Sequence, residues 1–264
     1  MNAPYLAQEV VEEIIDMLVG DAENLRSCSL VSKSWINRSR HNLFAFIKLR
    51  SLDDLQPWLE TGYLSGSRHH VRHLYLSEEN QTWITPDTIG EIIASFCNVE
   101  SLDLCYLKFT RFDECSPSEG FSQTLTSLTI QKSKVDSGTL PIFVCMFPNL
   151  DNLELNRIEK EVATIPSTGP TIAPRFRGKL ALLDVWSETG SIVAPFLDPP
   201  LSVAFKDVRV VNCTFGTEKV LRDLFFACEN TAETVELAKV FFGQSHLPIV
   251  PFTDARFSSK ILHF

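Results

Sequence analysis

Several features that define whole classes of protein are missing from this 264-residue chain. No run of eighteen or more apolar residues occurs, so we expect no membrane-spanning helix. Glycine (11) and proline (14) are too few for a fibrous or low-complexity chain. The first residues include Glu9, Glu12, Glu13 and Asp16, where a signal peptide would need a basic start and an apolar run. Secretion is therefore not expected.

The chain also lacks the motifs that mark common enzymes and metal sites. There is no Gly-x-Gly-x-x-Gly, no P-loop and no Gly-x-Ser-x-Gly. The seven cysteines contain no Cys-x-x-Cys pair, which suits neither a disulfide framework nor zinc and favours a reducing compartment, the cytoplasm or nucleus. His69, His70 and His73 form one cluster with no cysteine or carboxylate nearby in sequence, which favours a solvated loop. We expect no catalytic residue, no metal and no cofactor.

Positive charge is scarce as well. Aspartate and glutamate number 33 against 24 lysines and arginines, giving a net charge of −9, which argues against nucleic-acid binding through bulk electrostatics. What is abundant is apolar material, at 44% of residues, enough for a sizeable core. At roughly 150 residues per domain, the length allows one large domain or two smaller ones.

The first fifty residues predict three short helices. Residues 8–19 form an amphipathic pattern whose apolar members are Val10, Val11, Ile14, Ile15 and Leu18. Gly20 and Asp21 end this helix and cap a second around Leu25 to Leu30, and Ser32 caps a third that runs to about Ser39. So small a unit buries little surface and is marginal unless it docks on the rest of the chain or on a partner.

These residues also carry a resemblance to a known family. The stretch Leu6-Ala7-Gln8-Glu9-Val10-Val11-Glu12-Glu13-Ile14-Ile15 resembles the Leu-Pro-x-Glu-(apolar)₂-x-x-Ile-(apolar) opening of an F-box. Leu25 and the run from Cys28 to Trp35 resemble its second half, with Val-Ser-Lys-x-Trp the most specific part. The resemblance covers residues 6 to about 48. The usual proline of the family is replaced by Ala7.

The resemblance implies a specific partner, the Skp-type adaptor of a cullin–RING (SCF-type) ubiquitin ligase. By position in the motif, the adaptor-binding residues would be Leu6, Ala7, Val10, Ile14, Leu25, Val31 and Trp35. Because the family's proline lies where the adaptor binds, Ala7 is expected to weaken docking without abolishing it. The alternative for each residue is packing within its own unit; for Ile14 and Trp35 the two alternatives are evenly balanced, and for Leu6 and Val31 the interface is favoured.

The remaining residues contain a repeat. An apolar-x-x-apolar-x-apolar hexamer recurs seven times with a mean spacing near 27, and its first positions are Val71, Val99, Leu125, Leu150, Leu180, Phe205 and Ala232. This pattern resembles the opening of a leucine-rich repeat, whose period is about 20–29 residues. Cys213 occupies the repeat's Asn/Cys position, whereas Leu107, Ser133 and Ile158 mark units where that position is lost. The expected fold is α/β, a three-helix F-box followed by an irregular leucine-rich-repeat solenoid of about seven or eight units around a curved parallel sheet.

The segments between the strands differ in character. Residues 86–96 and 217–228 carry helical apolar patterns, so stacked units would share one core. The proline-containing stretches 156–179 and 195–200 predict convex-side loops without ordinary helix. A further strand is due near residue 259. The predicted domains are the F-box (1–48), a linker that is either a hinge or a packed bridge (49–69), and the repeat domain (70–264).

Alternation along each strand predicts the surface that would bind a target. If positions 1, 4 and 6 of a unit face the core, positions 3, 5 and 7 are exposed on the concave side. The candidates there are Tyr75, Asp103, Glu154, Asp184, Trp186, Asp207, Arg209 and Glu236. Five of these are acids and only one is a base, which favours a basic partner. The alternative is that the domain is simply acidic throughout.

Together these features predict a non-catalytic substrate-recognition subunit of an SCF-type ubiquitin ligase, cytoplasmic or nuclear. Its F-box would bind the adaptor while its repeats hold a target protein close to the ubiquitin-charged enzyme, which requires no catalytic residue in this chain. No nucleic-acid or membrane partner is expected. The alternative is an F-box scaffold or binding protein that acts outside a ligase, and Ala7 keeps that alternative open.

Overall fold

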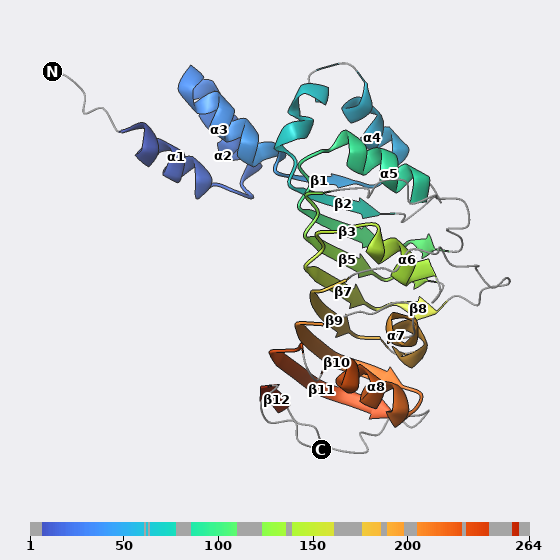
Figure 1. Cartoon of the computed structure of the whole chain (residues 1–264). Helices are drawn as coiled ribbons and strands as arrows, with labels where there is room; N and C mark the ends of the chain where they lie inside the picture. The colour runs from blue at the N-terminus through green and yellow to red at the C-terminus, as the bar shows by residue number, and fades with distance from the viewer. Residues whose placement is uncertain are drawn as a thin grey trace.

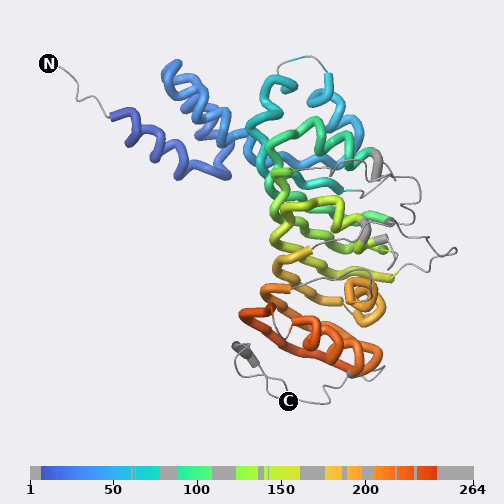
Figure 2. Tube along the Cα trace, in the orientation of Figure 1, coloured from blue at the N-terminus to red at the C-terminus, as the bar shows by residue number. Residues whose placement is uncertain are grey.

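The computed structural model shows three helices followed by one long sheet, an α/β arrangement (Figure 1). It describes residues 7–60, 62, 64–77, 86–109, 123–135, 139–160, 176–185, 189–197, 205–228, 231–242 and 255–258. Figure 2 traces the chain from the helices at one end of the molecule, along the sheet, to the other end. Within the described part, no helix is long and apolar enough to cross a membrane.

The N-terminal helices are α1 (Gln8–Asp16), α2 (Ala22–Val31) and α3 (Lys33–Phe44). All three were expected, but α1 ends three residues before residue 19 and α3 runs five residues beyond Ser39. Asp21 accepts a hydrogen bond from the backbone N–H of Asn24, and Ser32 accepts one from the N–H of Ser34, so both predicted caps are confirmed. The three helices share a small core of their own, which contains Val11, Ile15, Leu25, Leu18, Cys28, Trp35 and Leu43.

The sheet has nine strands in the order β1-β2-β3-β5-β7-β9-β10-β11-β12, and eight of them run parallel. Their bounds are β1 (Phe46–Leu49), β2 (His73–Ser77), β3 (Ser101–Cys105), β5 (Ser127–Gln131), β7 (Asn152–Asn156), β9 (Lys179–Leu183), β10 (Asp207–Phe215), β11 (Thr234–Phe242) and β12 (Ala255–Ser258). All seven expected strands are present. The further strand expected near residue 259 is β12, which pairs antiparallel with β11 and so does not continue the parallel series.

The structure adds one strand to those predicted from the repeat, and it shifts the alignment of one predicted unit. β1 pairs with β2 through Ile47↔Leu74, so Phe44-x-x-Ile47-x-Leu49 is an earlier copy of the hexamer. In β9, Leu180 pairs with Leu153, which makes Leu180 the fourth position of its unit and not the first. The misalignment arose because the true first position is the polar Arg177, while the neighbouring Phe176 is buried in its place.

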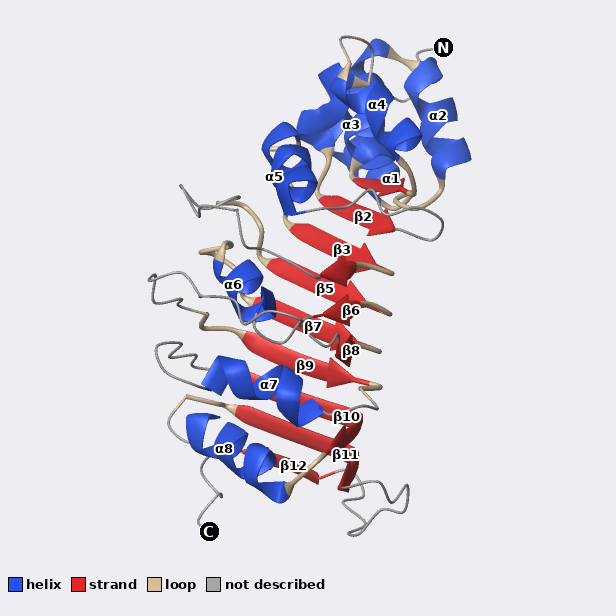
Figure 3. Ribbon diagram, turned by 90° about the vertical axis from the view of Figure 1, so that its right-hand side faces the viewer, coloured by secondary structure: helices blue, strands red, loops and turns tan. Residues whose placement is uncertain are grey.

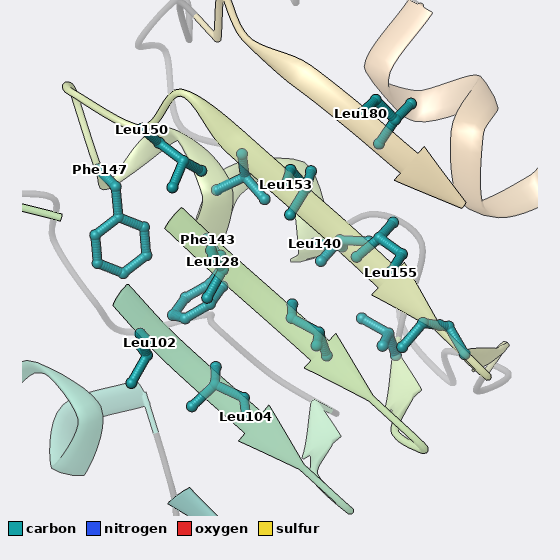
Figure 4. Packing of buried hydrophobic residues seen from close by; sticks show 14 of the residues in the cluster. Leu102, Leu104, Leu128, Leu140, Phe143, Phe147, Leu150, Leu153, Leu155 and Leu180 are labelled. Carbon is teal, nitrogen blue, oxygen red and sulfur yellow. The ribbon is translucent and has the colours of Figure 1, made fainter. Parts of the chain in front are cut away.

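Helices cover one face of the sheet (Figure 3). They are α5 (Pro86–Ser95), α6 (Thr139–Cys145), α7 (Thr189–Leu197) and α8 (Glu218–Cys228). The core lies between the two layers; Figure 4 shows leucines of β3, β5 and β7 gathered beside Leu140 and Phe143 of α6. The expectation that residue 195 cannot be helical is wrong, since Pro195 lies in the last turn of α7, which ends two residues later. Residues 161–175, with three of the prolines predicted to form loops, lie outside the described residues.

The segment between the three helices and the second strand is a packed bridge. It contains α4 (Leu52–Leu59) and the 3₁₀-helix η1 (Ser65–His70). Leu55 and Trp58 are buried, and the Trp58 ring lies 5.8 Å from that of Phe44 and 5.7 Å from that of Phe96. Of the two alternatives for this segment, the packing of its described residues favours the bridge.

Six of the repeated units share an unusual backbone turn. The residue after the seventh position has a positive φ between 48° and 62° in six units, at Tyr106, Lys132, Arg157, Asp184, Asn212 and Lys239. Non-glycine residues adopt this conformation at a cost of about 1–2 kcal/mol. Backbone hydrogen bonds to the next unit offset that cost, for example from Lys132 N to Asn156 O at 2.8 Å. Beyond the turn, β4 (Lys108–Phe109), β6 (Lys134–Val135) and β8 (Glu159–Lys160) form a second, three-stranded sheet.

The ninth position of the unit has a polar function in two of the described units. The Cys213 thiol donates to the carbonyls of Leu182 and Val211, both at 3.3 Å, and burial raises the pKa of this thiol to about 12. Ser133, expected to mark a lost position, is buried and accepts from the N–H of Leu107 at 3.0 Å. Its hydroxyl also donates to the carbonyl of Gln131 at 2.7 Å, the equivalent of the bond from Cys213 to Val211, so serine serves at this position as well as Asn or Cys.

Replacing Gly178 with alanine is expected to lower the free energy of unfolding by about 1–3 kcal/mol, the usual range for overpacking a tight site. A Cβ there would lie 2.3 Å from the Asp151 carbonyl oxygen, which already accepts from the N–H of Lys179 at 2.7 Å. Urea unfolding measures the change. Gly66→Ala is the control because its Cβ would meet nothing within 4 Å; equal effects of the two changes would contradict the prediction.

Candidate interaction surfaces

Three of the predicted adaptor-binding residues lie on the surface of the three-helix unit. Val10 is 41% exposed, Ile14 47% and Val31 65%. Ala7, at the N-cap of α1, is exposed as well, whereas Leu6 lies outside the described residues.

Two other predicted residues belong to the core of the unit. The assignment of Leu25 to the docking surface is wrong, because its side chain is 1% exposed and packs with Val11 and Ile15. Trp35 is partly buried against the same core, which favours the packing alternative for this residue. The physical reason is that three short helices must use their best apolar side chains on one another.

The structure adds three exposed apolar residues that the motif comparison did not single out: Leu30, 87% exposed, Met17, 83%, and Val19, 61%. The large exposed hydrophobic residues among the described ones number eleven, and six of them lie between residues 10 and 31. We call these six the apolar patch: Val10, Ile14, Met17, Val19, Leu30 and Val31.

A local signal for the patch was present in the sequence. The helix α1 contains the adjacent apolar pairs Val10-Val11 and Ile14-Ile15. Adjacent helical residues point about 100° apart, so a helix that meets only a small core turns one member of each pair toward the solvent. Val11 and Ile15 are buried, which leaves Val10 and Ile14 at the surface.

The predicted target-binding residues lie mainly on the face of the sheet opposite the helices, here called the open face. Tyr75, Asp103, Glu154, Arg209 and Glu236 share the fifth position of their units, in one row across the strands. Asp207 lies at the third position of β10. A hollow of about 400 Å³ opens in this face where Ala181 takes the place of a larger side chain between Glu154 and Arg209.

Two further candidates are not placed on this face. Asp184 follows the end of β9 and has the positive φ of the strand-end turn, so its assignment to the open face is wrong. It accepts from Asn212 at 2.7 Å and from Arg157 at 3.4 Å. The error follows directly from the misaligned unit. Trp186 lies outside the described residues.

The structure also changes the charge count that favoured a basic partner. Without Asp184, four acids remain at the third and fifth positions of the units. Three bases lie at the same positions: Arg209, Lys179 and, in β1, Lys48. The bases are engaged, with Lys179 3.4 Å from Asp207, Arg209 3.3 Å from Glu236, and Lys48 4.2 Å above the Tyr75 ring. The open face is therefore close to electrically balanced. Burial raises the pKa of Asp103 on this face, and a hydrogen bond with the Thr129 side chain lowers it in part.

The predicted histidine cluster is only partly solvated. His69 and His73 are exposed, but the segment is the helix η1 and the start of β2, not a loop. The half-buried His70 meets His41 of α3 at the junction between the three-helix unit and the sheet. The ring centroids are 5.7 Å apart for His41 and His70 and 3.8 Å for His69 and His70. His73 lies in β2. Among the described residues, no group of three His, Cys, Asp or Glu side chains is arranged to hold a metal ion.

This cluster predicts a pH dependence of stability. Burial lowers the pKa of both His41 and His70, and the neighbouring cations Arg38, Arg40, Arg72 and His69 lower it further, whereas Asp16 acts in the opposite direction on His41. Since the unfolded histidines titrate near 6.5, the unfolded state binds more protons below that pH. The free energy of unfolding should therefore be constant above about pH 7 and decrease as the pH falls through 6.5 and below.

Urea unfolding at several pH values between 7.5 and 5.5 tests this dependence. A His41→Gln, His70→Gln variant should lose most of the slope that the natural chain shows between those values. The same slope in both proteins would mean that other groups, such as carboxylates, cause it.

The chain was compared with known proteins. No protein-family model, no curated protein and no solved structure matches it.

Proposed function

We propose that this chain is a non-catalytic substrate-recognition subunit of an SCF-type (cullin–RING) ubiquitin ligase. Its three-helix unit would be an F-box that binds a Skp-type adaptor, and its sheet domain a leucine-rich-repeat-like solenoid that binds a target protein. The apolar patch is the observation that carries the proposal, because Val10, Ile14 and Val31 combine an F-box motif position with exposure.

The physical argument for a partner at this patch is the free energy of exposed apolar surface. Burying a large aliphatic side chain stabilises a complex by about 1.5–3 kcal/mol. Exposed large apolar side chains that are concentrated in one small unit suit an interaction site. Among the described residues, the core of this unit has three buried apolar side chains, so six exposed ones suit a partner that completes the core.

The proposed mechanism is proximity. A target held on the open face would be kept near the ubiquitin-charged enzyme, which raises the effective concentration of its lysines. The packed bridge suits this mechanism, because the Trp58 contacts with Phe44 and Phe96 join the three-helix unit to the sheet without a flexible linker. The regular strand spacing of 25–28 residues supports the solenoid part of the proposal.

Reconstitution tests the proposal. The purified chain is mixed with a Skp-type adaptor, then with cullin and RING subunits, and the products are separated by size-exclusion chromatography. We expect a one-to-one complex with the adaptor that is incorporated into the complete ligase. A folded chain that does not bind the adaptor would contradict the proposal.

A second candidate function is supported by one residue. Ala7 replaces the proline that the family usually presents to the adaptor, which favours a scaffold or binding protein acting outside a ligase. Adaptor binding without incorporation into a ligase, or without transfer of ubiquitin to any captured protein, would favour this second function.

A further inference from the structure

A ridge of exposed side chains follows the edge of the sheet at which the parallel strands have their carboxyl ends. It is separate from the apolar patch and from the open face. It comprises the eighth and tenth positions of three consecutive units: Tyr106, Lys108, Lys132, Lys134, Arg157 and Glu159. We call these six residues the edge ridge. Between them, Leu107, Ser133 and Ile158 of the ninth position are buried, so the eighth and tenth positions face outward together.

The backbone holds this ridge in a repeated geometry. The eighth-position residues Tyr106, Lys132 and Arg157 all have a positive φ. The backbone N–H of each donates to a carbonyl oxygen of the following unit, at N···O distances of 3.1, 2.8 and 2.9 Å. The tenth-position residues pair in register, Lys108 with Lys134 and Lys134 with Glu159. Paired strands lie about 4.8 Å apart, so equivalent side chains form two regularly spaced columns.

The ridge has four bases and one acid in a chain whose net charge is −9. Lys134 is 3.3 Å from Glu159, and Arg157 is 3.4 Å from Asp184 in the next unit. Lys132 contacts the Tyr106 hydroxyl at 2.8 Å, and within the described residues no ion pair joins Lys108 or Lys132 to a carboxylate. The field over the ridge is therefore opposite in sign to that of the whole chain.

We propose that the edge ridge binds an acidic segment of a partner protein. Lys108 and Lys132 would form charge-assisted hydrogen bonds with its Asp or Glu side chains, and the half-exposed Tyr106 ring would give an apolar contact at one end. A short acidic peptide fits better than a nucleic acid, because four bases are few for a long polyanion and the chain as a whole carries a net charge of −9. This inference is independent of the proposed function, since the ridge shares no residue with the apolar patch.

Fluorescence anisotropy with a labelled peptide of alternating glutamate and serine tests the inference with the full chain at low ionic strength, where such contacts are strongest. We expect saturable binding that a Lys108→Glu, Lys132→Glu variant weakens by about tenfold or more. Lys219→Glu, Arg222→Glu on α8 changes the charge by the same amount elsewhere and should leave the affinity within about twofold. Thermal unfolding shows that both variants are folded.

Three outcomes would overturn the inference. The first is no saturable binding by the natural chain, and the second is an equal loss of affinity in the two variants, which would indicate an effect of net charge alone. The third is tighter binding of a single-stranded oligonucleotide than of the acidic peptide, which would assign the ridge to nucleic acid.

Discussion

Changing Leu30 and Val31 to aspartate is expected to abolish complex formation with a Skp-type adaptor. The two side chains are 87% and 65% exposed at the carboxyl end of α2, where a partner can cover both. Losing the burial of two large aliphatic groups and desolvating two carboxylates would together weaken the complex by about 4 kcal/mol or more. This corresponds to roughly a thousandfold in the dissociation constant, which isothermal titration calorimetry can measure.

Phe226→Asp is the matched control for this double change. Phe226 is 62% exposed on α8, outside the apolar patch, so its replacement should leave the affinity for the adaptor unchanged. Because all three side chains are exposed, the free energy of unfolding should change little in either protein. Undiminished binding by the Leu30→Asp, Val31→Asp chain would contradict the assignment of the patch. Ala7→Pro, which restores the usual residue of the family, is expected to strengthen the complex.

Replacing Trp58 with alanine is expected to lower the free energy of unfolding by about 3–5 kcal/mol, the range for truncating a buried aromatic side chain. Trp58 is 8% exposed and lies between Phe44 at the end of α3 and Phe96 after α5. The change would leave a cavity at the junction of the three-helix unit and the sheet. Chemical denaturation followed by circular dichroism measures the loss.

Leu59→Ala, one residue further along α4, controls for the helix itself. Leu59 is 41% exposed, so its truncation should cost less than about 1 kcal/mol. A small effect at Trp58, or a three-helix unit that unfolds separately in the natural chain, would mean that the bridge does not hold the two parts together. In that case the proximity mechanism would lose its fixed geometry.

Much of the architecture could be predicted from local patterns. The hexamers located seven strands because burial of a strand on one face requires the same alternation in every unit. Asp21 and Ser32 marked two helix starts, since a side-chain oxygen there satisfies a free backbone N–H. The prediction was wrong at the unit that begins with Arg177. Because the first position there is polar, the hexamer was assigned three residues too late, and Asp184 was therefore predicted on the open face.

The candidate surfaces were only partly predictable, because exposure depends on packing between distant segments. The sequence by itself determined the order of helices and strands, the repeat and the apolar pairs of α1, since these depend on the spacing of residues along one element. Only the tertiary structure decided that Leu25 is in a core while Leu30 is on the surface, that His41 meets His70, and that Lys108 and Lys132 form one ridge. Those relations arise when segments far apart in the chain come into contact, so the spacing of residues within one element cannot predict them.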